Sequence, residues 1–245
     1  MKTKIVRINK YLSLCGVTSR RGADTLISEK RVTINDVTVE QMGQTVDIDT
    51  DVVKVDGTIV ELVEQKVYIL FNKPQQVMTT LNDPFKRKTV LHFLKDLPIR
   101  VYPVGRLDFD TEGVLLLTND GDLAYQLTHP KFQIEKIYDV KVDGHFTEAG
   151  SQAIAKGIKL EDGAIGKGKV HIIGRIKNFT NIRITLTEGR KREVKQLCKG
   201  VGHNVLSLRR INFAGITAEG LNLGKWRYLK SDEIELLRNT IEQNN

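Results

Sequence analysis

The sequence has few of the residues that build disulfide scaffolds or metal sites. Its two cysteines, Cys15 and Cys198, stand far apart, form no Cys-x-x-Cys pair and have no histidine partners spaced as in a metal site. Structural zinc sites and disulfide frameworks need closely spaced sets of such residues. We therefore expect free thiols in a reducing compartment and no bound metal ion.

Long apolar runs and internal repeats are also missing. No stretch approaches the roughly 20 apolar residues that span a bilayer. The basic N-terminal segment MKTKIVRINKYL is not followed by an apolar run of signal-peptide type. The sequence thus predicts a cytoplasmic protein that does not contact a membrane. With 245 residues, 40% of them apolar and 28% charged, the chain can form one medium-sized globular domain and a small one.

Positive charge is in excess and unevenly placed. Lysine and arginine outnumber the acids by 38 to 30, for a formal net charge of +8, which favours a polyanionic partner. Residues 1–31 and 189–210 are strongly basic, whereas residues 32–64 are acidic. Two separated basic segments suit a long nucleic acid that crosses both. The candidate contacts are Arg7, Lys10, Arg20, Arg21 and Lys30 in the first segment, and Arg190, Arg192, Arg209 and Arg210 in the second.

The first 60 residues contain the pattern of two short helices followed by strands. Apolar residues have helical spacing over 7–14, Gly16 ends that segment, and Ser19 can cap a second helix. Residues 31–57 then alternate Val, Ile and Thr between turn-forming residues, which indicates short strands. We expect residues 1–60 to form a small separate domain, with residues 58–66 as the connection.

Residues 66–240 are expected to form a second domain of strands with few helices. The apolar patterns predict strands at 67–72, 114–118, 137–142, 169–173, 182–187 and 203–211, and helices at 121–128, 147–156 and 191–199. The expected fold class is α+β, with a mixed, mostly antiparallel sheet. The last residues, IEQNN, are predicted to be frayed.

The most informative segment is VGRLDFDTEGVLLLTNDGDL, residues 104–123. It contains a glycine-flanked loop with Arg106 and Asp108, followed by an apolar stretch that can anchor the loop in a core. Asp110 and Asp120 are interpreted as turn residues. Asp108 lies between a leucine and a phenylalanine, so we expect its carboxylate to be partly buried. Burial alone disfavours a charged carboxylate, and an ionised Asp108 therefore needs a nearby cation.

This segment resembles the signature of the ribosomal RNA pseudouridine synthases of the small-subunit enzyme type and their large-subunit relatives. Other motifs of the same family are similar to LFNKP (70–74), KIYDV (136–140) and EGRKREVKQLCKGVGHNVLSLRRI (188–211). The N-terminal segment RINKYLSLCGVTSRRGADTLI resembles the RNA-binding domain named after small-subunit ribosomal protein four. The resemblance implies an enzyme that isomerises a uridine of ribosomal RNA to pseudouridine without cofactor or metal.

The resemblance also implies roles for single residues. Asp108 matches the essential carboxylate, which either attacks the nucleotide or removes a proton from the ribose. Tyr138 matches a tyrosine that packs under the base and moves a proton, although an ordinary strand aromatic would look the same. Lys195 matches a cation that pairs with Asp108, in a position where many relatives have arginine. Leu208 matches the floor of the pocket.

Two further roles concern the RNA itself. Arg106 matches a residue that enters the base stack when the target uridine is flipped out, because the enzyme cannot reach a stacked base; the alternative is a surface arginine that contacts only the RNA backbone. Lys73, in LFNKP, is predicted to contact RNA. We expect a monomer and favour a large-subunit target. A small-subunit target, a tRNA target, and a non-catalytic ribosome-assembly factor remain the alternatives.

Overall fold

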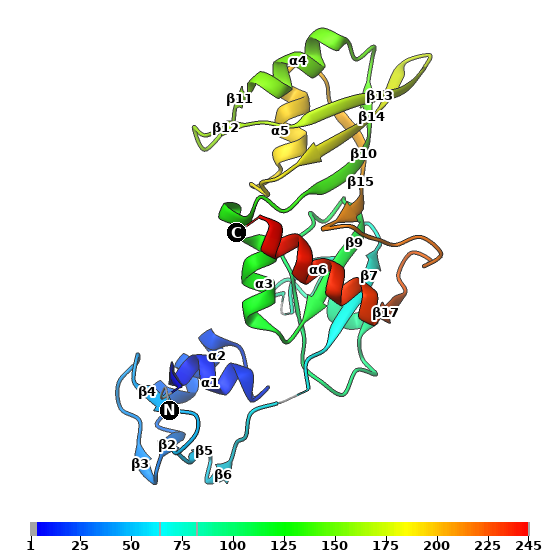
Figure 1. Ribbon diagram of the computed structural model, residues 1–245. Coiled ribbons are helices and arrows are strands. Elements are labelled where there is room, and N and C mark those ends of the chain that lie inside the picture. Colours follow the sequence, from blue (N-terminus) through cyan, green and yellow to red (C-terminus); the bar gives the residue numbers. More distant parts are fainter. Residues whose placement is uncertain (1–3, 64, 82, 245) are drawn as a thin grey trace. The chain divides into compact units, whose positions relative to one another are not determined.

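The structure, a computed structural model, describes residues 4–63, 65–81 and 83–244 (Figure 1). The chain divides into two compact units, residues 1–66 and residues 67–245. Each unit has a hydrophobic core of its own. Among the described residues, no helix is both long enough and apolar enough to cross a membrane.

The N-terminal unit consists of two short helices and two small antiparallel sheets. The helices are α1 (Ile8–Leu14) and α2 (Arg20–Ser28), and the Ser19 hydroxyl accepts a hydrogen bond from the Gly22 amide at 3.0 Å, which confirms the predicted cap. One sheet pairs β1 (Ile5–Arg7) with β4 (Thr45–Asp47). The other has the order β3-β2-β5-β6, with bounds Val37–Thr38, Val32–Ile34, Val53–Val55 and Thr58–Ile59.

One nine-stranded sheet organises the second unit. Its strand order is β13-β14-β10-β15-β9-β7-β17, with β16 beside β15 and β8 beside β9. Within the described part of this sheet, β15 with β9 is the parallel strand pair and the other strand pairs are antiparallel, so the mixed, mostly antiparallel sheet is confirmed. The bounds are β7 (Tyr68–Lys73), β8 (Tyr102–Pro103), β9 (Glu112–Thr118), β10 (Lys136–Asp143), β13 (Lys169–Ile176), β14 (Phe179–Leu186), β15 (Val205–Phe213), β16 (Ile216–Thr217) and β17 (Trp226–Tyr228). A separate pair joins β11 (Ile158–Lys159) to β12 (Ile165–Gly166).

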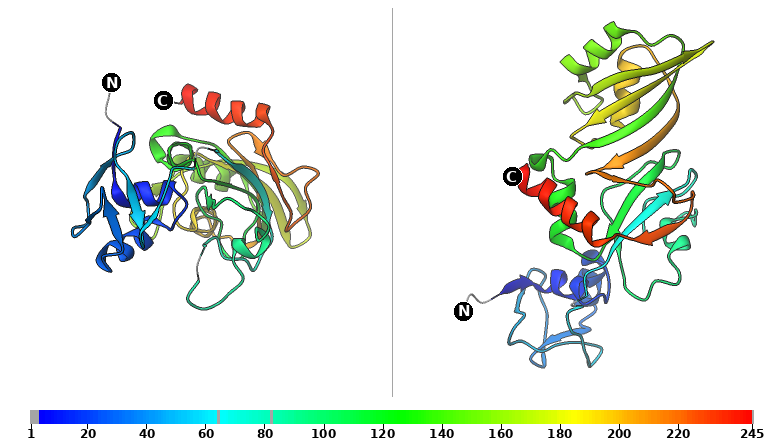
Figure 2. Two further views of the ribbon diagram at one scale, coloured as in Figure 1. Left: turned by 90° about the horizontal axis from the view of Figure 1, so that it is seen from below. Right: turned by 45° about the vertical axis from the view of Figure 1, so that its right-hand side comes forward.

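The central strands of this sheet have a core on each face, because successive side chains of a strand point to opposite sides. Ile69 and Phe71 enter one core, while Tyr68 and Leu70 enter the other. Helices α4 (Glu148–Lys156) and α5 (Glu193–Gly200) contribute to the first core, and α3 (Gly121–Thr128) and α6 (Ser231–Gln243) to the second (Figures 1 and 2). The short 3-10 helices are η1 (Val90–Phe93) and η2 (Pro130–Phe132).

The C-terminal helix α6 differs from the sequence prediction. Residues 241–245 were expected to be frayed, and the domain to end at residue 240, but the helix continues to Gln243. Leu237 and Ile241 are both buried in the second core. Their spacing from Ile234 is helical, so this apolar face anchors the end of the chain. The polar composition of the last residues concealed it, and the prediction of a frayed tail was wrong for residues 241–243; residue 245 lies outside the described residues.

Gly113 allows β9 and β15 to approach closely beside the loop that carries Asp108. The two strands pair at Glu112 with Arg209 and at Gly113 with Arg210. Gly113 has φ +107°, and a Cβ atom there would lie 2.1 Å from the Arg210 carbonyl oxygen. Only glycine combines this backbone conformation with such an approach. The pairing holds the start of β9, and with it the preceding loop, against β15.

Candidate active site

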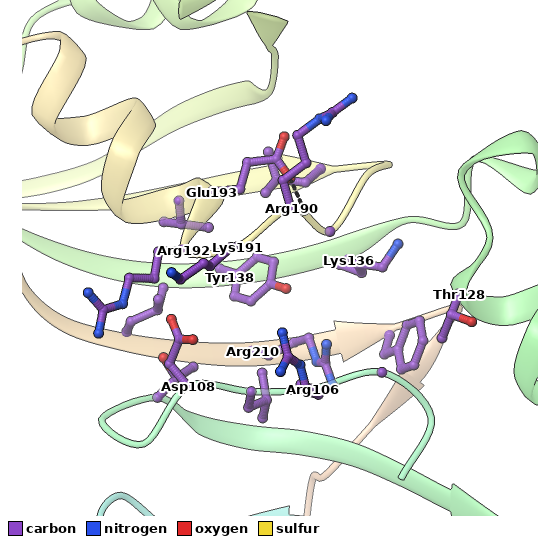
Figure 3. Close-up of a pocket in the computed structure, with 18 of the residues that line it drawn as sticks. Arg106, Asp108, Thr128, Lys136, Tyr138, Arg190, Lys191, Arg192, Glu193 and Arg210 are labelled. Carbon is purple, nitrogen blue, oxygen red and sulfur yellow. Dashed lines mark hydrogen bonds between the residues drawn. The ribbon is translucent and has the colours of Figure 1, made fainter. Parts of the chain in front are cut away.

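A pocket of about 220 Å³ lies where the 104–111 loop meets strands β10 and β15 and the segment leading into α5 (Figure 3). Four of the five predicted catalytic residues line it, namely Arg106, Asp108, Tyr138 and Leu208. Asp108 and Arg192 lie at one end in the view of Figure 3, and Lys136 and Thr128 at the other. The pocket therefore has a carboxylate at one end and a buried lysine at the other.

Lys73 holds the Asp108 loop through backbone carbonyls. This side chain at the end of β7 has no exposed surface, and its ammonium group donates hydrogen bonds to the carbonyls of Pro74 (3.1 Å), Asp108 (3.1 Å) and Thr111 (2.8 Å). Burial lowers the pKa of Lys73 to about 8, although nearby carboxylates oppose the change. The prediction that Lys73 contacts RNA was wrong, because the group is fully enclosed by the protein.

The segment after β7 holds the same loop at further points. The Thr79 hydroxyl donates to the Leu107 carbonyl at 2.7 Å and accepts from the Leu107 amide at 3.3 Å. The Gln76 amide donates to the Phe109 carbonyl at 2.7 Å. The Leu107 side chain is buried, whereas Phe109 is exposed. The backbone around Asp108 is thus fixed by hydrogen bonds, and the expected apolar enclosure exists on the leucine side only.

The cation Lys195 contacts a different carboxylate from the one expected. Its ammonium group donates to the two carboxylate oxygens of Asp110 at 2.5 and 2.6 Å, while the nearest oxygen of Asp108 is 3.9 Å away. The predicted proximity of Lys195 and Asp108 exists, but the closer partner is Asp110, which had been interpreted as a turn residue only. Burial opposes ionisation of Asp110, yet the hydrogen bonds and charge of Lys195 prevail and lower its pKa. The side chains of Lys195 and Asp110 are 23% and 65% exposed, so this pair is not a buried one.

Tyr138 and Leu208 reach the pocket from adjacent antiparallel strands. Tyr138 on β10 is opposite Arg210 on β15, and Val140 is opposite Leu208. Alternate residues of β10 face the first core, and Tyr138 and Leu208 are both buried there. They form an apolar floor with one phenol group, a suitable surface for one face of a planar ring.

Arginines surround this floor in three different environments. Arg106 is exposed and lines the pocket. Arg192 precedes α5 with a left-handed backbone, φ +53°, and also lines the pocket. Arg190 donates to Glu188 at 2.8 Å and to Asp162 at 3.3 Å, and the hydrogen bond that Glu188 accepts is the main cause of the raised pKa of Arg190. Its predicted contact with RNA would compete with these two carboxylates.

Arg209 and Arg210 do not form one patch, contrary to the sequence interpretation. Arg209 is exposed, whereas Arg210 is buried, lines the pocket and donates from Nε to the Val114 carbonyl at 2.7 Å. Neighbouring residues of a strand point to opposite faces, which explains the difference. The predicted RNA contact of Arg210 stays a prediction, and only a group inside the pocket can reach this side chain.

Lys136 is a pocket residue that the sequence reasoning missed. It is buried, and its ammonium group donates to the carbonyls of Ile134 (2.8 Å) and Thr187 (3.1 Å). Burial, followed by the charge of Arg210, lowers its pKa to about 8. The sequence did contain a signal for this position. Lys136 begins the KIYDV strand two residues before Tyr138, so the two side chains lie on the same face of the strand.

The basic residues predicted in the N-terminal unit are mostly exposed. Arg20 and Arg21 occupy the first turn of α2, where free backbone amides add to their charge. Arg7 is exposed before α1, Lys30 lies 3.8 Å from Glu40, and Lys10 is half-buried. Their contact with RNA stays a prediction. In the parts of the chain that are described, no three His, Cys, Asp or Glu residues are grouped as a metal site would need.

Comparison with known proteins agrees with this geometry. The family described as RNA pseudouridylate synthase matches residues 67–199. An Aquifex aeolicus protein named as an uncharacterised RNA pseudouridine synthase is 42% identical, over 95% of this chain and 93% of its own. The Bacillus subtilis ribosomal large subunit pseudouridine synthase B is 40% identical, over 95% of both chains.

A solved structure of a pseudouridylate synthase is similar to this one. It has a TM-score of 0.69 and 29% sequence identity, and the match covers 95% of this chain and 99% of the other. Sequence and fold agree over nearly the whole length. The chain belongs to the RNA pseudouridine synthase family.

Proposed function

We propose that this protein converts a uridine of large-subunit ribosomal RNA to pseudouridine in the cytoplasm, with Asp108 as the catalytic carboxylate. The observation that carries the proposal is the convergence of Asp108, Tyr138, Leu208 and Arg106 on one pocket, in a chain of this family. The name and 40% identity of the Bacillus subtilis relative support the large-subunit target.

The pocket can perform the chemistry with its own side chains. The flipped-out base lies on the floor made by Tyr138 and Leu208, and Arg106 at the rim fills the vacated position in the stack. Asp108 then assists cleavage of the bond between ribose C1′ and uracil N1, by attack or by proton removal. After the base turns, C1′ bonds to C5, the proton on C5 is lost, and N1 gains a proton, so that nothing is oxidised or released. We assign the removal of the C5 proton to Tyr138, whose phenol group lines the pocket.

The N-terminal unit is assigned to RNA binding, as a domain of the small-subunit ribosomal protein four type. Exposed Arg20 and Arg21 at the helix start, with Arg7 nearby in the sequence, support this assignment. Some acids of the same unit are paired with its own cations, for example Asp56 with Arg31 and Asp36 with Lys54. Arg31 and Lys54 are therefore already neutralised, whereas Arg20 and Arg21 are exposed at the start of α2.

The test is a modification assay on unmodified transcripts of large-subunit rRNA, small-subunit rRNA and tRNA. We expect the full-length protein to form one pseudouridine in the large-subunit transcript, and Asp108→Asn, which has the same volume, to form none while still binding it. Product in another transcript would overturn the subunit assignment. A folded wild-type protein that binds rRNA and modifies none of the transcripts would instead support a ribosome-assembly factor.

A further inference from the structure

Arg210 is a buried cation with an unused hydrogen-bond donor at the pocket. Its side chain is 3% exposed and lines the pocket. Nε donates to the Val114 carbonyl at 2.7 Å, and the guanidinium lies 4.7 Å from the centre of the Phe213 ring. The buried Nη2 atom has no hydrogen-bond partner in the protein. A buried donor without a partner needs an explanation, and the explanations are strain, a bound water or ion, or a catalytic role.

The surroundings of Arg210 increase its need for a negative partner. Lys136, two residues before Tyr138 on the neighbouring strand, is a second buried cation, and the charge of Arg210 contributes to lowering the pKa of Lys136. The donors of Lys136 are directed to two backbone carbonyls, whereas Nη2 of Arg210 is not directed to any acceptor of the chain. Two buried cations in one pocket are unfavourable without compensating negative charge. The buried Glu193, which also lines the pocket, acts on Lys136. Nη2 of Arg210 has no such partner in the protein, so it is suited to an acceptor on a ligand that carries negative charge.

The isomerisation produces such a charge on the base. When the bond between C1′ and N1 breaks, its electron pair stays with uracil, whether Asp108 bonds to C1′ or removes the proton from C2′. The uracil anion spreads this charge over N1, O2, C5 and O4. Turning the ring about its N3–C6 axis exchanges N1 with C5 and O2 with O4. One donor fixed beside a carbonyl oxygen therefore serves the base both before and after the turn.

We propose that Nη2 of Arg210 donates a hydrogen bond to a carbonyl oxygen of the target uracil and stabilises the uracil anion during the reaction. Arg210 is directly opposite Tyr138 in the strand register, beside the residue proposed to pack under the base. The charge that Nη2 meets is larger in the transition state than in the bound uridine, as catalysis requires. This proposal rests on the proposed function and adds a catalytic residue to it.

The test varies the leaving group. Fluorine at C5 withdraws electrons and makes the uracil anion less dependent on an external cation. The substrates are two versions of one rRNA fragment, with uridine or 5-fluorouridine at the target position. The single-turnover rate at which the N-linked target nucleotide disappears would be measured at saturating enzyme. RNA that is held covalently by the enzyme counts as reacted. Removing one oxyanion-type donor costs about 10²–10³ in rate. We expect a loss of this size for Arg210→Gln on uridine, but a loss about tenfold smaller on 5-fluorouridine.

Controls separate this role from a structural one. Arg210→Lys, which keeps the charge, should recover part of the rate on uridine, and it supplies the comparison should Arg210→Gln not fold. Lys73→Met, which disturbs the loop and leaves Arg210 intact, should slow both substrates by the same factor. Equal losses on both substrates for the Arg210 variants would overturn the inference. Failure of the wild-type enzyme on uridine RNA would instead contradict the proposed function.

Discussion

The ammonium group of Lys73 donates a hydrogen bond to the backbone carbonyl of Asp108, 3.1 Å away. The same group also donates hydrogen bonds to the carbonyls of Pro74 and Thr111. A buried cation thus holds the chain of the proposed catalytic residue without engaging its carboxylate. The carboxylate remains available to a substrate, and its position depends on a residue that the substrate cannot touch.

Lys73→Met should disable turnover without weakening RNA binding. The substitution removes the ammonium donor from three backbone carbonyls, of which the Asp108 carbonyl keeps the Thr111 amide as a donor at 3.1 Å. Each buried carbonyl left without a partner costs about 1–3 kcal/mol. We expect the single-turnover rate to fall more than about tenfold, because small displacements of a catalytic group are costly. RNA affinity, measured by filter binding, should stay unchanged. Lys177→Met, which removes an exposed lysine, is the matched control. A loss of affinity alone would mean that Lys73 contacts RNA after all.

The activity should fall above about pH 8, where Lys73 loses a proton. A neutral amine has two hydrogens for three carbonyls, so the Asp108 loop loses one hydrogen bond. Rate profiles between pH 7 and 9.5 would measure this alkaline limb. Lys136 has a similarly lowered pKa, and Lys136→Gln separates the two groups: the limb should persist in this variant. If the limb disappears in Lys136→Gln, the titrating group is Lys136.

The contribution of Lys73 to the stability of the folded protein should increase with pH, whereas the activity should decrease. The pKa of Lys73 is about 8 in the folded protein and 10.5 in an ordinary environment. Between these values the unfolded chain binds more protons than the folded one, so the contribution of Lys73 to the free energy of unfolding rises with pH. Urea unfolding of wild type and Lys73→Met at pH 7.5 and 9.5 would test this sign. The stability difference between the two proteins should be larger at pH 9.5.

Local signals in the sequence were sufficient for most elements of the fold. Ser19 as a helix cap, the helix after Asp120 and the apolar strands all depend on neighbours within a few residues, and the structure contains them. The 104–123 segment likewise placed Arg106 and Asp108 on a loop followed by a buried strand. Such signals need no knowledge of the tertiary arrangement.

The remaining differences depend on contacts between distant segments. Lys195 and Asp110 are 85 positions apart, and no local pattern distinguishes Asp110 from Asp108 as the partner of that cation. The burial of Lys73 likewise follows from carbonyls supplied by a loop 35–38 positions away. The local sequence around a lysine at the end of a strand is the same whether the side chain faces solvent or is buried. The sequence therefore indicated which residues gather at the site, but not how their charges pair.

Lys195→Met should slow catalysis with little loss of stability. Its pair with Asp110 is partly exposed, and pairs of this kind contribute about 0–1 kcal/mol. We expect urea unfolding to shift by no more than that, while the rate falls because positive charge beside Asp108 is lost. Asp110→Asn removes the competing partner and keeps Lys195, so its rate should stay within about threefold of wild type. A normal rate for Lys195→Met would show that Asp108 does not use this cation.

Replacing Arg20 and Arg21 together by glutamine in the full-length protein should weaken RNA binding and reduce its dependence on salt. Each phosphate contact contributes about 0.7–0.9 to the slope of log affinity against log salt, so losing two contacts should lower the slope by roughly 1.5. The matched control is Arg31→Gln with Lys54→Gln, which removes the same charge from the same unit but from residues already paired with Asp56 and Asp36. Both variants should react at the wild-type rate once saturated with enzyme. Equal salt slopes for the two double variants would show that net charge, and not the start of α2, attracts the RNA.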